Sequence, residues 1–220
     1  GEKSLPWLNI EKEPNPALGL RAIRFSLKNR QLFRTQIRAI LRASDRHNVR
    51  LMVPMITELE EVIELKSVVE EVKDELRQAG IPFDESIPIG VMIEVPAAAV
   101  LIDSIIREVD YVSIGTNDLI QYYLAVDRGN EAVSYLFKPH HPAVLKLLAR
   151  VIKTVNKYGK EVTVCGEMAA DPLSAIILLG MGLRHFSMNP IFIPRVKKAL
   201  KEVENKTAEE AVKQALKLKT

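Results

Sequence analysis

Side chains with ligand-binding chemistry, namely a carboxylate, an amide and an arginine, fall within the stretch 115–128, just after an apolar segment. The segment 111–114 favours a β-strand and a glycine then breaks the pattern, so Asn117 and Asp118 lie at the exit of the predicted strand. Such a group suits a phosphorylated acid held on a metal ion, because arginine binds phosphate and carboxylates bind metals. The alternative is that Thr116, Asn117 or Asp118 only caps the helix that follows.

Glu94 stands at the end of another apolar segment, 89–95, and its neighbours would leave a charged carboxylate in poor solvent. An unpaired buried carboxylate costs several kcal/mol, so this side chain needs a cation. Neighbouring parallel strands lie about 4.8 Å apart, which allows Glu94 and Asp118 to share one Mg²⁺ ion. That ion takes one or two protein carboxylates together with substrate oxygens. The alternative is a structural salt bridge from Glu94 to an arginine.

Arginine and cysteine side chains extend the candidate site. Arginine presents a planar fork that fits phosphate and carboxylate, although each arginine alone also fits an ordinary surface position. The candidates are Arg21, Arg24, Arg50 and Arg128. Cys165 ends a further apolar segment, from which a thiol can reach the same site and donate or accept a proton; the alternative is inert packing. The four histidines show no metal-ligand spacing, and we interpret them as structural.

Alternation of apolar segments with amphipathic ones predicts the elements that position these residues. The predicted strands are 49–55, 89–95, 111–114, 162–165 and 185–188, and the predicted helices are 28–47, 58–78, 97–108, 142–158 and 172–180. Strand and helix in repeated alternation indicate right-handed βαβ units and a parallel sheet. Asp171 before Pro172 predicts a helix start, and Gly80, Gly159 and Gly180 predict helix ends.

The predicted fold is α/β of the (β/α)₈ TIM-barrel type, here an incomplete barrel with about five of the eight strands. Residues 1–27 contain no strand signal and are predicted to be an entry loop, so we expect the first strands of the barrel to precede this chain. Residues 194–220 are rich in Lys, Glu, Ala and Leu. They predict two short, solvated helices with a break near Asn205.

Composition narrows the class of protein. The chain has 220 residues, of which 47% are hydrophobic, and this argues for one folded domain. Basic and acidic residues are mixed along the chain to a net charge of +3, which argues against a nucleic-acid partner. A single cysteine excludes an internal disulfide, and no apolar run approaches the length of a membrane span. We expect a soluble cytoplasmic protein.

Seven motifs in order resemble the phosphoenolpyruvate-binding barrel of the PEP-utilising enzymes, and the resemblance covers nearly the whole chain. They are residues 20–24, 51–56, 90–98, 113–119, 124–130, 164–167 and 179–182. Within the family, residues 121–130 look most like the branch that feeds the bacterial sugar phosphotransferase system. The resemblance implies transfer of the phosphoryl group of phosphoenolpyruvate (PEP) to a histidine, with release of pyruvate.

The resemblance also assigns roles to individual residues. Glu94 and Asp118 match Mg²⁺ ligands, and Asn117 and Arg128 match a phosphate-binding pair. Arg21 matches a further substrate-site arginine. Cys165 matches the residue that protonates the enolate. The resemblance further implies a homodimer, and it places the acceptor histidine, the docking site for a phosphocarrier protein and two more phosphate-binding arginines outside these 220 residues. On this basis we expect the chain alone to be inactive.

Two other functions remain open from the residues. Related barrels place a Glu and an Asp on Mg²⁺ to hold an enolate, so a Mg²⁺-dependent lyase or aldolase that acts on pyruvate is one alternative. Arg128 and Cys165 are the discriminating residues, since such an enzyme needs no phosphate-binding arginine. The other alternative is a non-catalytic dimerisation fragment.

Overall fold

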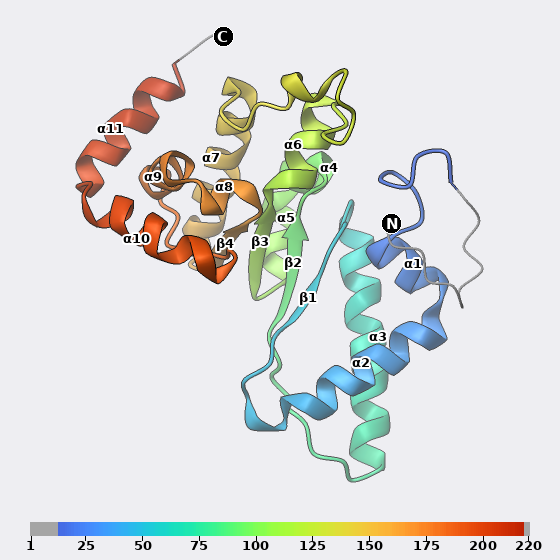
Figure 1. The fold of residues 1–220 in the computed structure, drawn as a ribbon. Coiled ribbons are helices and arrows are strands. Elements are labelled where there is room, and N and C mark those ends of the chain that lie inside the picture. The colour runs from blue at the N-terminus through green and yellow to red at the C-terminus, as the bar shows by residue number, and fades with distance from the viewer. Residues whose placement is uncertain (1–12, 218–220) are drawn as a thin grey trace.

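Five parallel strands form one sheet at the centre of the molecule (Figure 1). The computed structural model describes residues 13–217. The strands are β1 (Leu51–Val53), β2 (Ile89–Ile93), β3 (Tyr111–Gly115), β4 (Glu161–Cys165) and β5 (His185–Phe186), and each pairs with the next one along the chain. An open doubly wound sheet reverses its strand order at a switch point, whereas the wall of a barrel keeps the order of the chain. The predicted α/β fold of TIM-barrel type, with five parallel strands, is confirmed.

Helices cover one face of this sheet, and side chains along each strand point alternately toward that face and toward the other one. Val91, Val112 and Val162 share one register level of the covered face, and each is at most 3% exposed. They belong to a core that also includes the buried faces of α3 (Leu59–Gln78), α5 (Ile102–Glu108) and α7 (Pro142–Lys157). These helices pack one against the next in chain order. The other face carries side chains such as Met92, which points away from the helices by strand alternation.

Several predicted boundaries were wrong in detail. The predicted entry loop 1–27 overlaps helix α1 (Ala22–Lys28), while residues 1–12 lie outside the described residues. The predicted helix 28–47 is divided at Asn29, whose φ of −110° and ψ of 55° are not helical, into α1 and α2 (Arg30–Ala43), and the turn η1 (Ser44–Arg46) follows. The predicted helix 97–108 is likewise divided, at Leu101, into α4 (Pro96–Val100) and α5.

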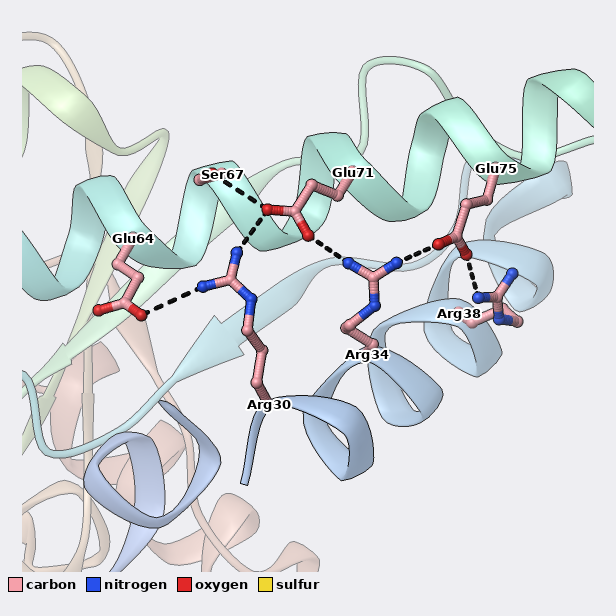
Figure 2. A network of polar contacts seen from close by, with 7 residues as sticks. All are labelled: Arg30, Arg34, Arg38, Glu64, Ser67, Glu71 and Glu75. Atoms are coloured by element: carbon pink, nitrogen blue, oxygen red, sulfur yellow. Dashed lines mark hydrogen bonds and ion pairs between the residues drawn. The ribbon is translucent and has the colours of Figure 1, made fainter. Parts of the chain in front are cut away.

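Helix α2 packs on α3 through two kinds of contact. Phe33, Ile37 and Leu41, spaced four residues apart, form its buried stripe. Beside that stripe a ladder of arginines meets glutamates of α3 (Figure 2), and it comprises Arg30, Arg34, Arg38, Glu64, Glu71 and Glu75. Alternating charges in such a ladder satisfy one another, so the ladder fixes how α2 lies along α3.

The remaining helices and turns lie on the side of the molecule away from α2 and α3 (Figure 1). They are α6 (Thr116–Leu124), η2 (Ser134–Leu136), α8 (Glu167–Ala170), α9 (Pro172–Gly180), η3 (Pro190–Phe192), α10 (Ile193–Lys201) and α11 (Asn205–Ala215). Asp171 caps α9 as predicted, since its carboxylate accepts a hydrogen bond from the Ser174 amide at 2.8 Å. Among residues 13–217, none of the helices combines the length and the apolar character that a membrane span requires.

The last two helices are packed more closely than a solvated surface segment. Val196 of α10 and Ala208 and Val212 of α11 are buried, and both helices contact α9. A side chain at Gly180 would place its Cβ 2.2 Å from the Ala208 carbonyl oxygen. Helix α9 ends at Gly180 as predicted, although Gly180 is its last helical residue and Met181 is the C-cap. The missing side chain at Gly180 also allows α11 to pack closely on α9. Gly80 and Gly159, with φ of +65° and +66°, follow their helices as predicted.

Candidate functional site

The candidate residues gather where the strands end. Glu94 follows β2, Asp118 lies in the first turn of the helix after β3, and Cys165 is the last residue of β4. The carboxyl ends of parallel strands meet at one edge of the sheet, which is where α/β proteins place their ligand sites. The fold therefore brings these three side chains to a common edge.

Glu94 is buried, with 5% of its surface exposed, and it has no ion pair within the described residues. One carboxylate oxygen accepts a hydrogen bond from the backbone amide of Met55 at 2.8 Å. Burial raises the pKa of Glu94 to about 7. The Met55 hydrogen bond and the nearby positive charge of Arg21 oppose this rise, and the charge of Asp118 adds to it. The alternative of a structural salt bridge from Glu94 to an arginine was wrong.

Asp118 holds the arginine instead. Its carboxylate lies 3.1 Å from Nη2 of Arg21, with 15% of the Asp118 side chain and 28% of the Arg21 side chain exposed. Arg21 enters from the segment before α1, far from Asp118 in the sequence, and the next residue, Ala22, has a φ of +51°. A positive φ at a residue with a side chain is uncommon and costs energy, and such residues cluster at functional sites.

The helix-capping alternative for residues 116–118 was wrong. The N-cap of α6 is Gly115, and no side chain caps that helix. Thr116 donates a hydrogen bond to the Cys165 carbonyl oxygen at 2.8 Å, and Asn117 accepts one from the Glu167 amide at 3.1 Å. All three polar side chains at the exit of β3 therefore reach across to other segments of the site.

Close approach at two glycines makes this arrangement possible. A Cβ at Gly115 would lie 2.8 Å from a carboxylate oxygen of Glu94, so the Glu94 side chain lies over the end of β3. Gly115 is also the register partner of Cys165. A Cβ at Gly166 would lie 2.6 Å from the Thr116 hydroxyl, and the φ of +88° at Gly166 favours glycine as well.

Cys165 is partly buried beside these groups. Burial raises the pKa of its thiol, a hydrogen bond from Ser113 opposes this rise, and the charge of Glu94 adds to it. Its Sγ atom lies 3.5 Å from the Ile114 carbonyl oxygen. The thiol is therefore neutral near pH 7 and carries a proton that it can donate.

Among the predicted site residues, Arg128 makes the least direct contact with the others. It lies in the exposed connection between α6 and α7, where its guanidinium is 3.6 Å from Glu167 and its amide donates to Gln121 at 3.2 Å. Within residues 13–217 it has no direct polar contact with Glu94 or Asp118. Arg128 is linked to Asn117 only indirectly, because it contacts the side chain of Glu167, whose backbone amide donates a hydrogen bond to Asn117.

The donor set fits Mg²⁺. Glu94 and Asp118 offer hard carboxylate oxygens, and burial without an ion pair among the described residues leaves Glu94 able to bind a cation. In the part of the chain that the structure describes, no group of three or more His, Cys, Asp and Glu side chains could enclose a metal. Mg²⁺ requires no such group, because it keeps several waters and takes one or two carboxylates with substrate oxygens.

Two contributors to the site were missed from the sequence. The Met55 amide reaches Glu94 because Met55 adopts a φ of +63°, and no residue type at that position signals this conformation. Tyr122 contacts Arg21 from α6 through a hydrogen bond of 3.1 Å. Its spacing of four residues from Asp118 was the available signal, since residues i and i+4 share a helix face.

Fold and site together define a TIM-barrel-type α/β domain with a polar site at the carboxyl ends of its strands. Solved structures with a similar fold include a citrate lyase from Burkholderia xenovorans LB400, with a TM-score of 0.57, 20% identity, and coverage of 76% of this chain and 53% of the other. A pyruvate kinase from Cryptosporidium parvum has a TM-score of 0.53, 14% identity, and coverage of 84% of this chain and 38% of the other. These likenesses concern the fold alone.

The chain belongs to the family of PEP-utilising enzymes, whose PEP-binding domain matches residues 1–205. Similar proteins named phosphoenolpyruvate-protein phosphotransferase occur in Buchnera aphidicola subsp. Acyrthosiphon pisum (strain APS) and Bacillus subtilis (strain 168). They are 47% and 46% identical over all 220 residues, which cover 38% and 39% of the relatives. The Haemophilus influenzae protein of that name is 50% identical over 203 residues, 92% of this chain and 35% of the relative. The chain thus spans less than two fifths of the length of these relatives.

Proposed function

We propose that this chain is the PEP-binding catalytic domain of a phosphoenolpyruvate-protein phosphotransferase. The observation that carries the proposal is the meeting of Glu94, Asp118 and Arg21 at one edge of the sheet. Two carboxylates and an arginine suit a substrate that bears both a phosphate and a carboxylate. The similarity of this chain to phosphotransferases over its whole length supports the same assignment.

In this proposal Glu94 and Asp118 hold Mg²⁺, and Arg21, Asn117 and Arg128 bind the oxygens of PEP. When bound, Mg²⁺ supplies positive charge that stabilises charge developing on phosphoryl and enolate oxygens. Glu94 gives up its proton when it binds a cation. Asp118 then shares its charge between the cation and Arg21, which it already contacts.

The phosphoryl group leaves PEP when its P–O bond breaks and a P–N bond to a histidine forms. In our proposal that histidine lies in a preceding domain, which also docks a phosphocarrier protein. The enolate left behind takes a proton at its methylene carbon, and we assign this proton to the neutral thiol of Cys165. A homodimer in the cytoplasm, acting in a sugar phosphotransferase system, completes the proposal.

Isothermal titration calorimetry of PEP into the protein at its native length, with and without Mg²⁺, tests this function. We expect Mg²⁺-dependent binding that weakens by at least about tenfold in Glu94→Gln, because the variant keeps the shape and loses the charge. The matched control is Glu202→Gln, since Glu202 pairs only at 4.0 Å with Lys198 on an exposed surface. Wild-type protein that does not bind PEP, or Glu94→Gln that binds it equally well, contradicts the proposal.

A further inference from the structure

Two side chains of helix α6, one helical turn apart, contact the guanidinium of Arg21. Asp118 and Tyr122 are four residues apart and so lie on the same side of the helix. Asp118 contacts Nη2 of Arg21 at 3.1 Å, and the Tyr122 hydroxyl accepts a hydrogen bond from Nη1 at 3.1 Å. Nη1 of Arg21 also donates a longer hydrogen bond to the Ala17 carbonyl oxygen at 3.5 Å. The guanidinium is therefore held at both Nη atoms, while its Nε–H and one N–H of Nη2 stay available to a ligand.

The Tyr122 hydroxyl is engaged on both sides. It donates its hydrogen to the Ala17 carbonyl oxygen at 2.6 Å while it accepts from Arg21. Burial raises the pKa of Tyr122, and the charge of Asp118 raises it further, so the phenol keeps this hydrogen at neutral pH. The hydroxyl also lies 3.9 Å from the sulfur of Met55. Met55 is the residue whose backbone amide donates a hydrogen bond to Glu94.

The same hydroxyl ties residues 13–21 to the rest of the domain. A pocket of about 410 Å³ is lined by residues of this segment and by residues at and after the end of α6, among them Leu18 and Val126. Beside this pocket the Tyr122 hydroxyl holds Ala17 by its hydrogen bond. Within residues 13–217, every polar side-chain contact that joins residues 13–21 to elements beyond α1 comes from Asp118 or Tyr122.

We propose that Tyr122 is a positioning residue that sets Arg21 and the segment 13–21 for PEP binding. This inference rests on the function proposed above. Tyr122 acts through Arg21: it orders a long, flexible side chain before the ligand arrives, which removes part of the entropy that binding would otherwise cost. Its hydroxyl is the group that matters, because the aromatic ring packs against the core whether or not the oxygen is present.

The test measures PEP affinity by calorimetry, in saturating Mg²⁺, for four versions of the native-length protein. These are the wild type, Tyr122→Phe, Arg21→Ala and the double variant. Loss of one hydrogen bond to a charged group predicts an affinity at least about tenfold weaker in Tyr122→Phe. In the Arg21→Ala background the same change should have a much smaller effect, because the charged partner of the hydroxyl is gone and only its hydrogen bond to Ala17 remains. Tyr123→Phe is the matched control, since Tyr123 is the next residue and its side chain is exposed.

The outcomes separate this inference from the function on which it rests. Wild-type protein that does not bind PEP overturns both. Wild-type protein that binds PEP while Tyr122→Phe binds it equally well overturns the positioning role alone. An equal loss in the presence and absence of Arg21 also overturns it, because Tyr122 would then act by general stabilisation. Thermal unfolding of each variant shows whether an affinity change is accompanied by a loss of fold stability.

Discussion

The Glu94 carboxyl group is buried and forms no ion pair among the described residues. Its pKa of about 7 lies above the ordinary value of 4.5, so the folded protein binds this proton more tightly than the unfolded chain does. Between those two pKa values the free energy of unfolding should therefore fall as pH rises. The fall is on the order of 3 kcal/mol for a shift of this size. Urea unfolding in a chelating buffer, at steps between pH 5 and pH 8, measures it.

The control for this prediction is Glu94→Gln, because glutamine has the same size as glutamate and does not titrate. Its stability should lack this component of the pH dependence, so the difference between wild type and variant should change with pH in that window. A difference that stays constant from pH 5 to pH 8 would show that the buried carboxylate does not titrate there.

The sequence was sufficient to place residues that lie at or just after the end of a strand. Glu94, Asp118 and Cys165 are of this kind, and parallel pairing brings the carboxyl ends of their strands together. The sequence was insufficient for contacts that depend on an unusual backbone or on a distant segment. The φ of +63° at Met55 and the hydrogen bond from Tyr122 to Ala17 are of that kind. The site roles of the predicted residues remain predictions until binding is measured.

At the scale of elements, periodicity identified the helices but not their breaks or their partners. The buried stripe of α2 follows a four-residue spacing that can be read from the sequence. The break at Asn29 was missed, although asparagine is a favoured residue at helix ends. The C-terminal helices were predicted as solvated because Lys and Glu dominate them. Their few apolar residues, Val196, Ala208 and Val212, nevertheless face α9, and such sparse contacts are invisible without the tertiary arrangement.

Gly180 offers a test of how closely α9 and α11 pack. By helix propensity alone, Gly180→Ala should stabilise the protein by about 1 kcal/mol. We expect the opposite, a loss of roughly 1–3 kcal/mol, because the new Cβ would lie 2.2 Å from the Ala208 carbonyl oxygen and the backbone would have to move. Urea unfolding at constant pH measures the sign and the size.

Gly129→Ala is the matched control for this change. Its nearest neighbour would be a side-chain oxygen of Asp127 at 3.3 Å, which can move aside. We expect a change within about 0.5 kcal/mol there. A stabilised Gly180→Ala variant would mean that α11 does not pack on α9 as closely as described.

At the scale of the whole molecule, the site joins segments that are far apart in the chain. Its groups come from the segment before α1, from the ends of β1, β2 and β4, and from α6. The parallel strand order is what allows this, since every strand delivers its carboxyl end to the same edge. The opposite edge is different in character: Arg50 and Glu161 pair there at 2.8 Å, and Arg50 lies over the ring of Tyr111.

A ligand at such a site should stabilise the entire fold, because unfolding any of the joined segments removes its binding groups. Ligand at 100 times its dissociation constant adds about 2.7 kcal/mol, which raises the midpoint of thermal unfolding by roughly 5–10 °C in a domain of this size. We expect this rise with PEP and Mg²⁺ together and a much smaller one with either alone, measured by differential scanning calorimetry. Glu94→Gln should lose the joint effect, whereas Glu161→Gln, altered at the opposite edge, should keep it despite a lower starting midpoint. An equal loss in both variants would show that stability, and not the site, governs the shift.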